Sequence, residues 1–231
     1  MSELRVASYN IHSCIGIDRK FDPARIAGII RAFDADIIGL QEVGWHHRGL
    51  RNFNQFAYLE DATGMTILEG PTKLHPYAHY GNAILTRAPV ETHWTLDLSL
   101  PWHIPRGCIM AEIGIGEKTV TVINAHLGLT PWDRHQQSRR IAHELDRIDG
   151  EIILMGDFNT RRPHGQSVRL LARRLPYYTT EATYHTRLPR APFDRIYLSE
   201  NLRFTDISVP RDQHSGKASD HLPIVADIAW V

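Results

Sequence analysis

The chain alternates between short apolar runs, which are typical of buried strands, and stretches whose apolar residues recur at helical spacing. The short runs predict strands at 4–11, 36–43, 80–86, 90–98, 108–115, 119–126, 151–155, 194–198, 202–209 and 224–230. A turn at Gly116-Glu117-Lys118 predicts an antiparallel hairpin between the fifth and sixth runs. No internal repeat or linker interrupts the pattern. It therefore predicts a mixed α and β fold, with residues 1–231 forming a single domain.

Two of the predicted helices have a clear apolar face. The first begins with Asp22 as the N-cap and Pro23 as the first helical residue, and its apolar positions are Ile26, Ile29, Ile30 and Phe33. The longest begins near Pro131 and ends at Gly150; it is expected to bury Ile141, Leu145 and Ile148 and to expose Arg139, Arg140 and Glu144. A third, weaker helix is expected between Asn54 and Thr63.

Composition limits the class of protein without naming it. The 231 residues are 42% hydrophobic and 23% charged, which is the ordinary range of a globular chain. No apolar run approaches the roughly 18 residues of a membrane-spanning helix, and the N-terminus lacks a signal-peptide pattern, so we expect a cytoplasmic protein. Cys14 and Cys108 show no zinc-binding or disulfide spacing and are expected to be reduced thiols.

The charge balance argues against a surface built to attract polyanions. The chain has 26 basic and 26 acidic residues, so its formal net charge is zero. Proteins that bind long duplex DNA without sequence specificity usually carry a basic excess, because counterion release supplies most of the affinity. The 14 histidines raise a hypothesis of metal or phosphate chemistry, with scattered surface histidines as the simpler alternative.

Polar residues repeatedly stand where an apolar strand ends. A buried strand has no reason to end in carboxylate, amide or imidazole groups unless these find water, a partner or a ligand. Each one alone is explained as a cap or turn residue. If the strands are neighbours, however, one rim of the fold collects all of them: Asn10, Gln41, Glu42, Asn124, His126, Asp157, Asn159, Asp194, Ser219, Asp220 and His221.

This set of residue types fits one chemistry. The carboxylates, together with the amides of Asn10 and Asn159, are hard oxygen ligands that suit Mg²⁺ or Mn²⁺ better than zinc. A histidine oriented and kept charged by Asp194 can face a developing negative charge, as phosphate-ester chemistry requires. The chain has no Gly-x-Ser-x-Gly elbow, P-loop or Gly-x-Gly-x-x-Gly motif, so kinase, GTPase and dehydrogenase functions are not supported.

Seven short motifs, in this order, give the chain a family resemblance. They are Ser8-Tyr9-Asn10-Ile11, Leu40-Gln41-Glu42-Val43, Gly81-Asn82-Ala83-Ile84-Leu85, Asn124-Ala125-His126-Leu127, Gly156-Asp157-Phe158-Asn159, Phe193-Asp194-Arg195-Ile196 and Ser219-Asp220-His221. The chain resembles the endonuclease/exonuclease/phosphatase superfamily of divalent-metal phosphoesterases over its whole length. The resemblance implies an α+β, DNase I-like fold, in which two mainly antiparallel sheets form an α/β/β/α sandwich of four layers. It also implies an active site at one rim of the sheets.

The resemblance further implies roles for individual residues. Glu42 would be the principal metal ligand for Mg²⁺ or Mn²⁺, with Asn10 nearby and Asp220 contributing directly or through water. Asp157 would hold or deprotonate the attacking water, and Asn159 would fix the geometry of the water and the phosphate. His221, paired with Asp194, would stabilise the pentavalent phosphate or act as a base, and His126 would contact a phosphoryl oxygen or the leaving group. Asn82 and Asn124 are expected either to contact the phosphate or to have only a structural role.

The family does not name the substrate, so the loops around the site must determine it. Arg106 could clamp a phosphate, and Trp102 of the same loop could stack on a base or only pack the loop. Trp45 lies in another loop expected to ring the metal, and Arg161 and Arg162 lie in a third, where arginine could also clamp a phosphate. We expect a monomeric phosphodiesterase whose substrate is a small organophosphate or a phospholipid headgroup. The alternatives are a nonspecific DNA or RNA nuclease, a catalytically silent binding module and a histidine-rich zinc protein.

Overall fold

The computed structural model describes residues 3–44, 53–73, 80–212 and 214–231. Its strands form two mixed sheets of six strands each, and each sheet contains one parallel pair among antiparallel neighbours. The first sheet has the order β11-β12-β1-β2-β4-β3. Its strands are β1 (Glu3–Asn10), β2 (Ile37–Gly44), β3 (Thr66–Lys73), β4 (Tyr80–Thr86), β11 (Leu202–Ser208) and β12 (Ile224–Trp230).

The second sheet has the order β5-β6-β7-β8-β10-β9. Its strands are β5 (Val90–Asp97), β6 (Gly107–Ile115), β7 (Lys118–His126), β8 (Glu151–Asp157), β9 (Tyr177–Tyr178) and β10 (Asp194–Leu198). The predicted hairpin is confirmed as the antiparallel β6–β7 pair. The helices are α1 (Pro23–Phe33), α2 (Gln55–Thr63), α3 (Pro131–Leu145), α4 (Gln166–Leu171) and α5 (Ser215–Ala218), and His12–Cys14 form a 3₁₀ turn, η1.

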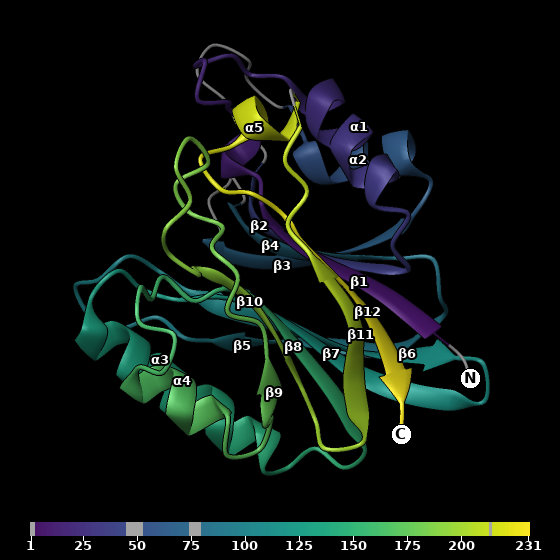
Figure 1. Cartoon of the computed structure of the whole chain (residues 1–231), viewed down its shortest axis with the longest axis vertical. Helices are drawn as coiled ribbons and strands as arrows, with labels where there is room; N and C mark the ends of the chain where they lie inside the picture. Colours follow the sequence, from purple (N-terminus) through teal and green to yellow (C-terminus); the bar gives the residue numbers. More distant parts are fainter. Residues whose placement is uncertain (1–2, 45–52, 74–79, 213) are drawn as a thin grey trace.

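The two sheets face each other and helices cover their outer sides. Figure 1 shows α1 and α2 beyond the first sheet and α3 and α4 beyond the second. Three hydrophobic layers fill the spaces between these four structural layers. Ile30 and Tyr9 represent the layer under α1 and α2, Val6 and Ile153 the layer between the sheets, and Leu154 and Ile141 the layer under α3. The expected α/β/β/α sandwich is therefore confirmed.

The alternation of side chains along each strand explains how one strand serves two layers. Successive residues point to opposite faces, so Ile152 packs toward α3 and Ile153 toward the other sheet. The strands most buried on both faces are the near-continuous apolar runs that the sequence shows, since neither face meets water. The apolar face predicted for α1 is confirmed: Asp22 caps the helix by accepting from the Arg25 backbone N–H, and the predicted apolar residues Ile26, Ile29, Ile30 and Phe33 are all buried.

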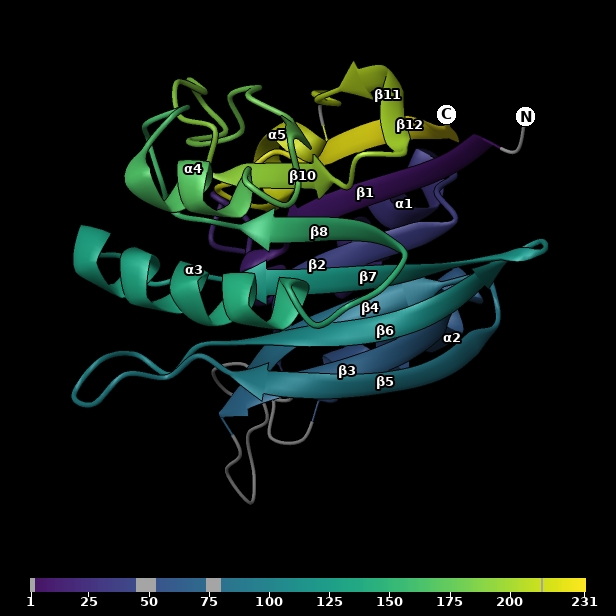
Figure 2. The same cartoon turned by 90° about the horizontal axis from the view of Figure 1, so that it is seen from below.

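The topology collects the ends of non-adjacent strands at one edge of the sandwich. β1 and β2 are parallel and are joined through α1, and β7 and β8 are parallel and are joined through α3. In Figure 2 these four strands run toward the same end of the molecule. The amino end of β10 lies there too, because β10 is antiparallel to β8 and Asp194 pairs with Asp157. The predicted common rim of polar residues thus follows from the strand order.

Buried amides connect the two sheets close to this rim. Asn124 of β7 donates from Nδ2 to the carbonyl oxygens of Leu40 and Ala83 in the first sheet, at 2.7 Å each, and accepts from Gln41 Nε2 at 2.7 Å. The close approach requires a glycine opposite: a Cβ built on Gly39 would lie 2.9 Å from Asn124 Cγ. These hydrogen bonds cross from one sheet to the other, so they fix how the sheets lie against each other.

Three features differ from the sequence-based expectations. β3 was not expected, because Gly70 and Pro71 interrupt its pattern; Pro71 is tolerated because β3 is an edge strand. The longest helix ends at Leu145 and not at Gly150, and the backbone N–H of Asp146 closes its last turn by bonding to the carbonyl of Ala142. The short elements α4 and β9 also lacked a recognisable pattern.

No helix within the described part of the chain is long and apolar enough to cross a membrane.

We expect Asn124→Ala to lower the free energy of unfolding by about 2–4 kcal/mol. The substitution removes three hydrogen bonds between the sheets and takes the Asn124 donor away from two buried carbonyl groups, while Gln41 Nε2 keeps Ser8 Oγ and the Gly39 carbonyl as partners. Urea denaturation measures the change. Thr119→Ala, at an exposed position of the same strand, is the control and should cost under about 1 kcal/mol. Equal effects of the two substitutions would show that Asn124 does not hold the sheets together.

Candidate functional site

A bulge in β2 projects Glu42 out of its sheet. β2 and β4 pair Leu40 with Ala83 and then Val43 with Gly81, so two residues of β2 lie opposite one of β4. Within this bulge Glu42 adopts a left-handed backbone conformation with φ 61°. A non-glycine residue held in this region costs about 1–3 kcal/mol, and such strain is concentrated at functional sites. The bulge therefore turns a carboxylate from the sheet toward the rim.

Asn10 links two carboxylates that come from different sheets. Its Nδ2 donates to Glu42 Oε1 at 3.2 Å and to Asp157 Oδ2 at 3.1 Å. Its Oδ1 accepts from the backbone N–H of His12 at 3.0 Å, which fixes the orientation of the amide. Asn10 is buried, so the amide is held between the two carboxylates and is not free to rotate into water. The ends of β1, β2 and β8 are thereby joined at one point.

Asp220 and His221 reach the same point from the loop before β12. Ser219 anchors this loop, because its hydroxyl donates to the Asn10 carbonyl at 2.7 Å and accepts from the His221 backbone N–H at 3.1 Å. Asp220 is partly exposed, and its Oδ1 lies 3.7 Å from His12 Nδ1. A single buried serine thus positions both functional side chains.

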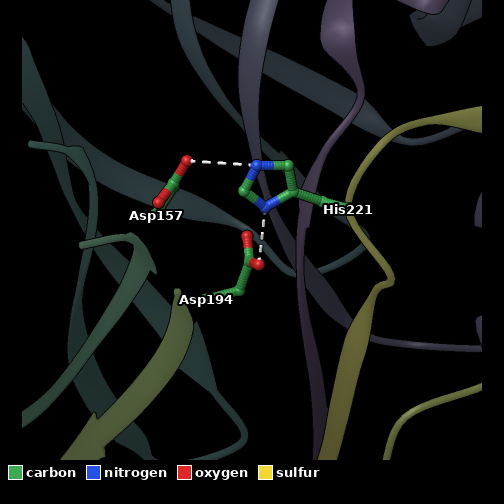
Figure 3. Close-up of side chains that lie close together, drawn as sticks. All are labelled: Asp157, Asp194 and His221. Atoms are coloured by element: carbon green, nitrogen blue, oxygen red, sulfur yellow. Dashed lines mark hydrogen bonds and ion pairs between the residues drawn. The ribbon is translucent and has the colours of Figure 1, made fainter. Parts of the chain in front are cut away.

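His221 forms a buried ion pair with Asp194. The distance from His221 Nδ1 to Asp194 Oδ2 is 2.8 Å, and Nε2 faces Asp157 Oδ2 at 3.7 Å (Figure 3). Thr183 donates from Oγ1 to the same Asp194 oxygen at 2.5 Å. Burial alone would lower the pKa of His221, but the charges of Asp194 and Asp157 outweigh it and raise the pKa to about 10. The imidazole is therefore held in its charged form at neutral pH.

His126 has the opposite protonation preference. Burial, the charge of Arg106 and the charge of His221 all lower its pKa well below the ordinary value. The Asn159 amide donates to the Leu127 carbonyl at 3.0 Å and lies 3.2 Å from His126 Nε2. Nε2 also lies 3.4 Å from Asp157 Oδ2, so it faces both the amide and the carboxylate. One neutral and one charged imidazole therefore flank Asp157.

Asp157 is an almost fully buried carboxylate at the end of β8. Burial, together with the charge of Asp194, raises its pKa to about 6 despite the opposing charge of His221. The preceding Gly156 has φ 144°, and a Cβ there would lie 1.9 Å from the Ala125 carbonyl oxygen, so only glycine permits this approach of β8 to β7. The Asn159 backbone N–H donates to Asp157 Oδ1 at 2.9 Å and fixes the carboxylate from the other side.

These groups lie at the base of a cavity of about 1450 Å³. Glu42, His126, Asp157, Asn159, Asp220 and His221 all line it, as does Arg106. The stacked rings of Tyr184 and Phe193, with centroids 4.6 Å apart, form part of one wall. Asn10 and Asp194 are not among the lining residues, so they act on the cavity only through the side chains that they hold.

Three of the expected substrate contacts do not agree with the structure. Asn124 does not line the cavity and uses its amide between the sheets; Asn82 does not line it either and donates to the Gly107 carbonyl at 2.8 Å. Both asparagines have the structural role that was the alternative. Trp102 is fully exposed on its loop and also does not line the cavity, so its position supports neither a stacking role in the cavity nor packing of the loop. Trp45 lies outside the described residues.

Sequence reasoning missed several residues of the site. Thr183 holds Asp194, and Tyr80 forms a hydrogen bond with Glu42. Arg134 of α3 lines the cavity as well, as do Arg161 and Arg162 of the loop after β8, which is one of the loops that the sequence places around the metal. Tyr80 directly precedes the Gly81-Asn82 motif, which was a usable signal. Thr183 and Arg134 stand in no motif, and only the folded chain brings them to the rim.

The residues present fit a divalent cation with oxygen ligands. Glu42 and Asp220 line the cavity as partly exposed carboxylates, beside the amide of Asn10. A second group, Asp157, Asp194 and His221, has ligand atoms within 4.8 Å of one another. Its His221 Nδ1 already faces Asp194 as an ion pair, however, so this group is better described as a charge network than as a ligand set. A hard cation such as Mg²⁺ prefers the first group.

The fold and the site together define a class, the DNase I-like phosphoesterases with an acidic site at the rim of a two-sheet sandwich. The family model for the "Endonuclease/Exonuclease/phosphatase family" matches residues 7–221. The chain belongs to this family, which generally hydrolyses phosphoester bonds and depends on divalent metal ions. The resemblance inferred from the seven motifs is confirmed.

Named relatives show how widely this fold is used. The chain is 28% identical over 242 residues to the protein YbhP of Escherichia coli (strain K12), covering 97% of this chain and 95% of YbhP. The mannosyl-6-phosphatase Bt3783 of Bacteroides thetaiotaomicron has a similar structure, with a TM-score of 0.76, 19% identity, and 98% and 100% of the two chains covered. D. rerio TDP2 in complex with single-strand DNA product also has a TM-score of 0.76, with 17% identity and 99% and 100% covered. At these identities the two structures establish the fold alone.

Proposed function

We propose that this protein is a Mg²⁺- or Mn²⁺-dependent phosphoesterase that hydrolyses a phosphodiester by in-line attack of water. The observation that carries the proposal is the position of Asn10, which joins the carboxylates of Glu42 and Asp157 beneath an open cavity. Two histidines of opposite charge preference flank this pair. Family membership supports phosphoester hydrolysis in general, and the geometry of the site supports the roles proposed below for individual residues.

Glu42 would hold the metal, with Asp220 and the amide of Asn10 beside it. When bound, the metal would neutralise charge on the phosphoryl oxygens and make the phosphorus more electrophilic. Tyr80 bonds to Glu42 and would orient the carboxylate. A divalent cation would also offset the mutual repulsion of carboxylates that the fold gathers at this rim.

Asp157 would hold the attacking water and accept its proton. Its pKa of about 6 lets it accept a proton near neutral pH, and Asn159 would fix the water and the phosphate beside it. As the water oxygen bonds to phosphorus, the ester P–O bond breaks and the leaving oxygen departs with its electron pair. His221, kept charged by Asp194, would stabilise the negative charge that develops on the pentavalent phosphate.

His126 would contact a phosphoryl oxygen or the leaving group as a neutral imidazole. To donate from Nε2, the ring must carry its single hydrogen there. In the free protein Nε2 lies 3.2 Å from the Asn159 amide nitrogen and 3.4 Å from Asp157 Oδ2. Substrate binding would therefore replace a contact with one of these side chains by a hydrogen bond to the substrate.

A compact substrate is favoured over long duplex DNA. The zero net charge provides no long-range attraction for a polyanion, while the cavity of about 1450 Å³ can enclose a small organophosphate or a phospholipid headgroup. A nuclease is the second candidate, and the observation that favours it is the similarity to TDP2 bound to a DNA product. Hydrolysis of bis(p-nitrophenyl) phosphate, p-nitrophenyl phosphate, plasmid, single-stranded oligonucleotide and phospholipid, compared with Mg²⁺ and with Mn²⁺, separates these substrates.

We expect EDTA to abolish hydrolysis of bis(p-nitrophenyl) phosphate and Mg²⁺ or Mn²⁺ to restore it, because the metal neutralises the phosphoryl charge. Glu42→Gln should show the same loss at ordinary metal concentrations. Glu112→Gln, a partly exposed glutamate on β6 outside the cavity lining, is the control and should keep wild-type rates. Full activity in chelator, or in Glu42→Gln, would contradict the assignment.

Asp194→Asn should lower kcat about 100-fold or more, since it removes the charge that keeps His221 protonated and oriented. His221→Ala should be at least as damaging. The double variant should lose little more than the worse single variant, because the two residues act as a unit. Steady-state kinetics measures all three, with Asp206→Asn on exposed β11 as the control. Independent, additive losses would show that the pair does not act as one.

Arg106→Gln should raise KM for a compact phosphodiester by about tenfold, since its guanidinium lies in the cavity close enough for its charge to lower the pKa of His126. Trp102→Ala, on the same loop but fully exposed, should change KM less than twofold. The KM of both variants, measured with one soluble diester, decides the matter. A larger increase in KM for Trp102→Ala than for Arg106→Gln would support the stacking role that the sequence predicted for Trp102.

A further inference from the structure

Four arginines line the active-site cavity without a carboxylate partner. Arg106, Arg134, Arg161 and Arg162 come from three separate loops or helices, yet all face the same space. None of them forms an ion pair with an acidic residue in the part of the chain that the structure describes, whereas Arg5 and Arg87 elsewhere do. The proposed metal ligands Glu42 and Asp220 line the same cavity, as does Asp157. We call these carboxylates the acidic centre of the cavity and the four arginines its basic wall.

Arg106 is an almost fully buried cation at the inner part of this wall. It is only 6% exposed, and its Nε is buried without a hydrogen-bond partner. Its charge acts on His126 and on Tyr80, which places it next to the reacting centre. A buried guanidinium whose N–H groups have no acceptor is energetically unfavourable unless an anion binds to it.

Arg134 lies farther along the wall, in the first turns of α3. Its Nη1 donates to the carbonyl of Leu129 at 2.6 Å and more weakly to that of Gly128 at 3.4 Å, which fixes the guanidinium against the loop before the helix. Among the described residues, its other nitrogens have no acceptor. Burial lowers the pKa of Arg134, although the negative charge of the neighbouring Asp133 raises it. The guanidinium therefore loses part of its hydration, and its protein contacts do not fully replace it.

Arg161 and Arg162 face these residues from the loop after β8. The guanidinium of Arg161 lies 5.9 Å above the Phe193 ring, which holds it beside the cavity as a cation–π contact. Gln166 and Ser167, at the start of α4, line the same cavity and supply neutral polar groups. Cations and hydrogen-bond donors from α3, α4 and two loops thus line one cavity.

We propose that this region, formed by Arg134, Arg161 and Arg162 with Arg106 at its inner edge, binds a second phosphate group of the substrate, distinct from the phosphoryl group that is hydrolysed. The inference rests on the proposed function, since it specifies the substrate of the same site. Planar guanidinium groups match phosphate oxygens through paired N–H donors, and several of them can converge on one dianion. The natural substrate is then a phosphodiester that also carries a phosphomonoester.

Such a substrate can be a nucleotide or a phosphorylated lipid headgroup, and two substrate pairs distinguish these sources. The first pair is thymidine 5′-(p-nitrophenyl phosphate) with and without a 3′-phosphate. The second is glycerophosphoinositol with and without a 4-phosphate. The members of each pair differ by one phosphate only. We expect kcat/KM to be at least about tenfold higher for the phosphorylated member of one pair, mainly through KM, and the pair with the larger ratio identifies the source.

Arg134→Gln and Arg161→Gln should each reduce this ratio at least threefold. Arg161 is exposed, so its substitution leaves the core intact if Arg134→Gln folds poorly. Arg139→Gln is the matched control, because Arg139 is an exposed arginine of the same helix α3 that does not line the cavity. It should leave the ratio unchanged. A ratio near one in both pairs, or equal effects of Arg134→Gln and Arg139→Gln, would overturn the second phosphate site.

Binding without turnover separates this inference from the proposed function. Calorimetry with thymidine 3′,5′-bisphosphate and thymidine 5′-monophosphate, and with inositol 1,4-bisphosphate and inositol 1-phosphate, measures the preference directly. If no phosphodiester is hydrolysed but a bisphosphate binds at least tenfold more tightly and Arg134→Gln abolishes the difference, the phosphate site stands and the proposed function fails. If diesters are hydrolysed and both members of each pair bind equally, the proposed function stands and the second site fails.

Discussion

Polar strand ends buried between two sheets must find partners in each other, because water does not reach them. Asn124 satisfies this requirement deep in the sandwich, with both its amide nitrogen and its oxygen bonded to the other sheet, and Asn10 satisfies it at the rim by bonding to carboxylates from both sheets. These hydrogen bonds fix the sheets in one relative position. The hydrophobic layer between the sheets, which includes Val6 and Ile153, supplies most of the attraction but is much less directional. The geometry of the site therefore depends on a few buried amides.

Burial at the rim also gives different protonation states to the two histidines that lie on either side of Asp157. His126 loses its charge to desolvation and to Arg106, while His221 keeps its charge because Asp194 faces it without intervening solvent. A neutral and a charged imidazole can perform different parts of one reaction at one pH. Thr183 extends this arrangement by one more hydrogen bond, since it donates to the Asp194 oxygen that His221 uses.

The acidic centre and the arginine-lined wall come from different parts of the fold. Glu42 and Asp157 stand at strand ends that the two parallel pairs bring together, so the sandwich itself creates the centre. Arg134 and Arg161 stand in α3 and in a loop, outside the sheets. Loops and helix ends can change without disturbing the sheets, which is how one fold comes to act on different substrates. Specificity in this protein is accordingly expected from the wall and chemistry from the centre.

The sequence by itself determined the elements with strong local patterns and the family. Apolar runs identified nearly every long strand, the Asp22-Pro23 cap identified α1, and seven motifs in order identified the family and with it the sandwich. These signals are local, because side-chain alternation, capping and motif residues lie within a few positions of one another. The edge strand β3 was not predicted, because Pro71 interrupts its pattern. Proline is acceptable in a strand only where no neighbouring strand needs its N–H, and the sequence alone does not show that β3 lies at an edge.

Only the tertiary structure decided which polar residues face the cavity. Asn124 and His126 are two residues apart on β7, yet the amide lies between the sheets and only the imidazole lines the cavity. Arg106 and Trp102 share a loop, but the arginine is buried in the site and the tryptophan is fully exposed. Arg134 and Thr183 have no sequence signal at all. Their roles arise from contacts between segments far apart in the chain, and local residue pattern carries no information about such contacts.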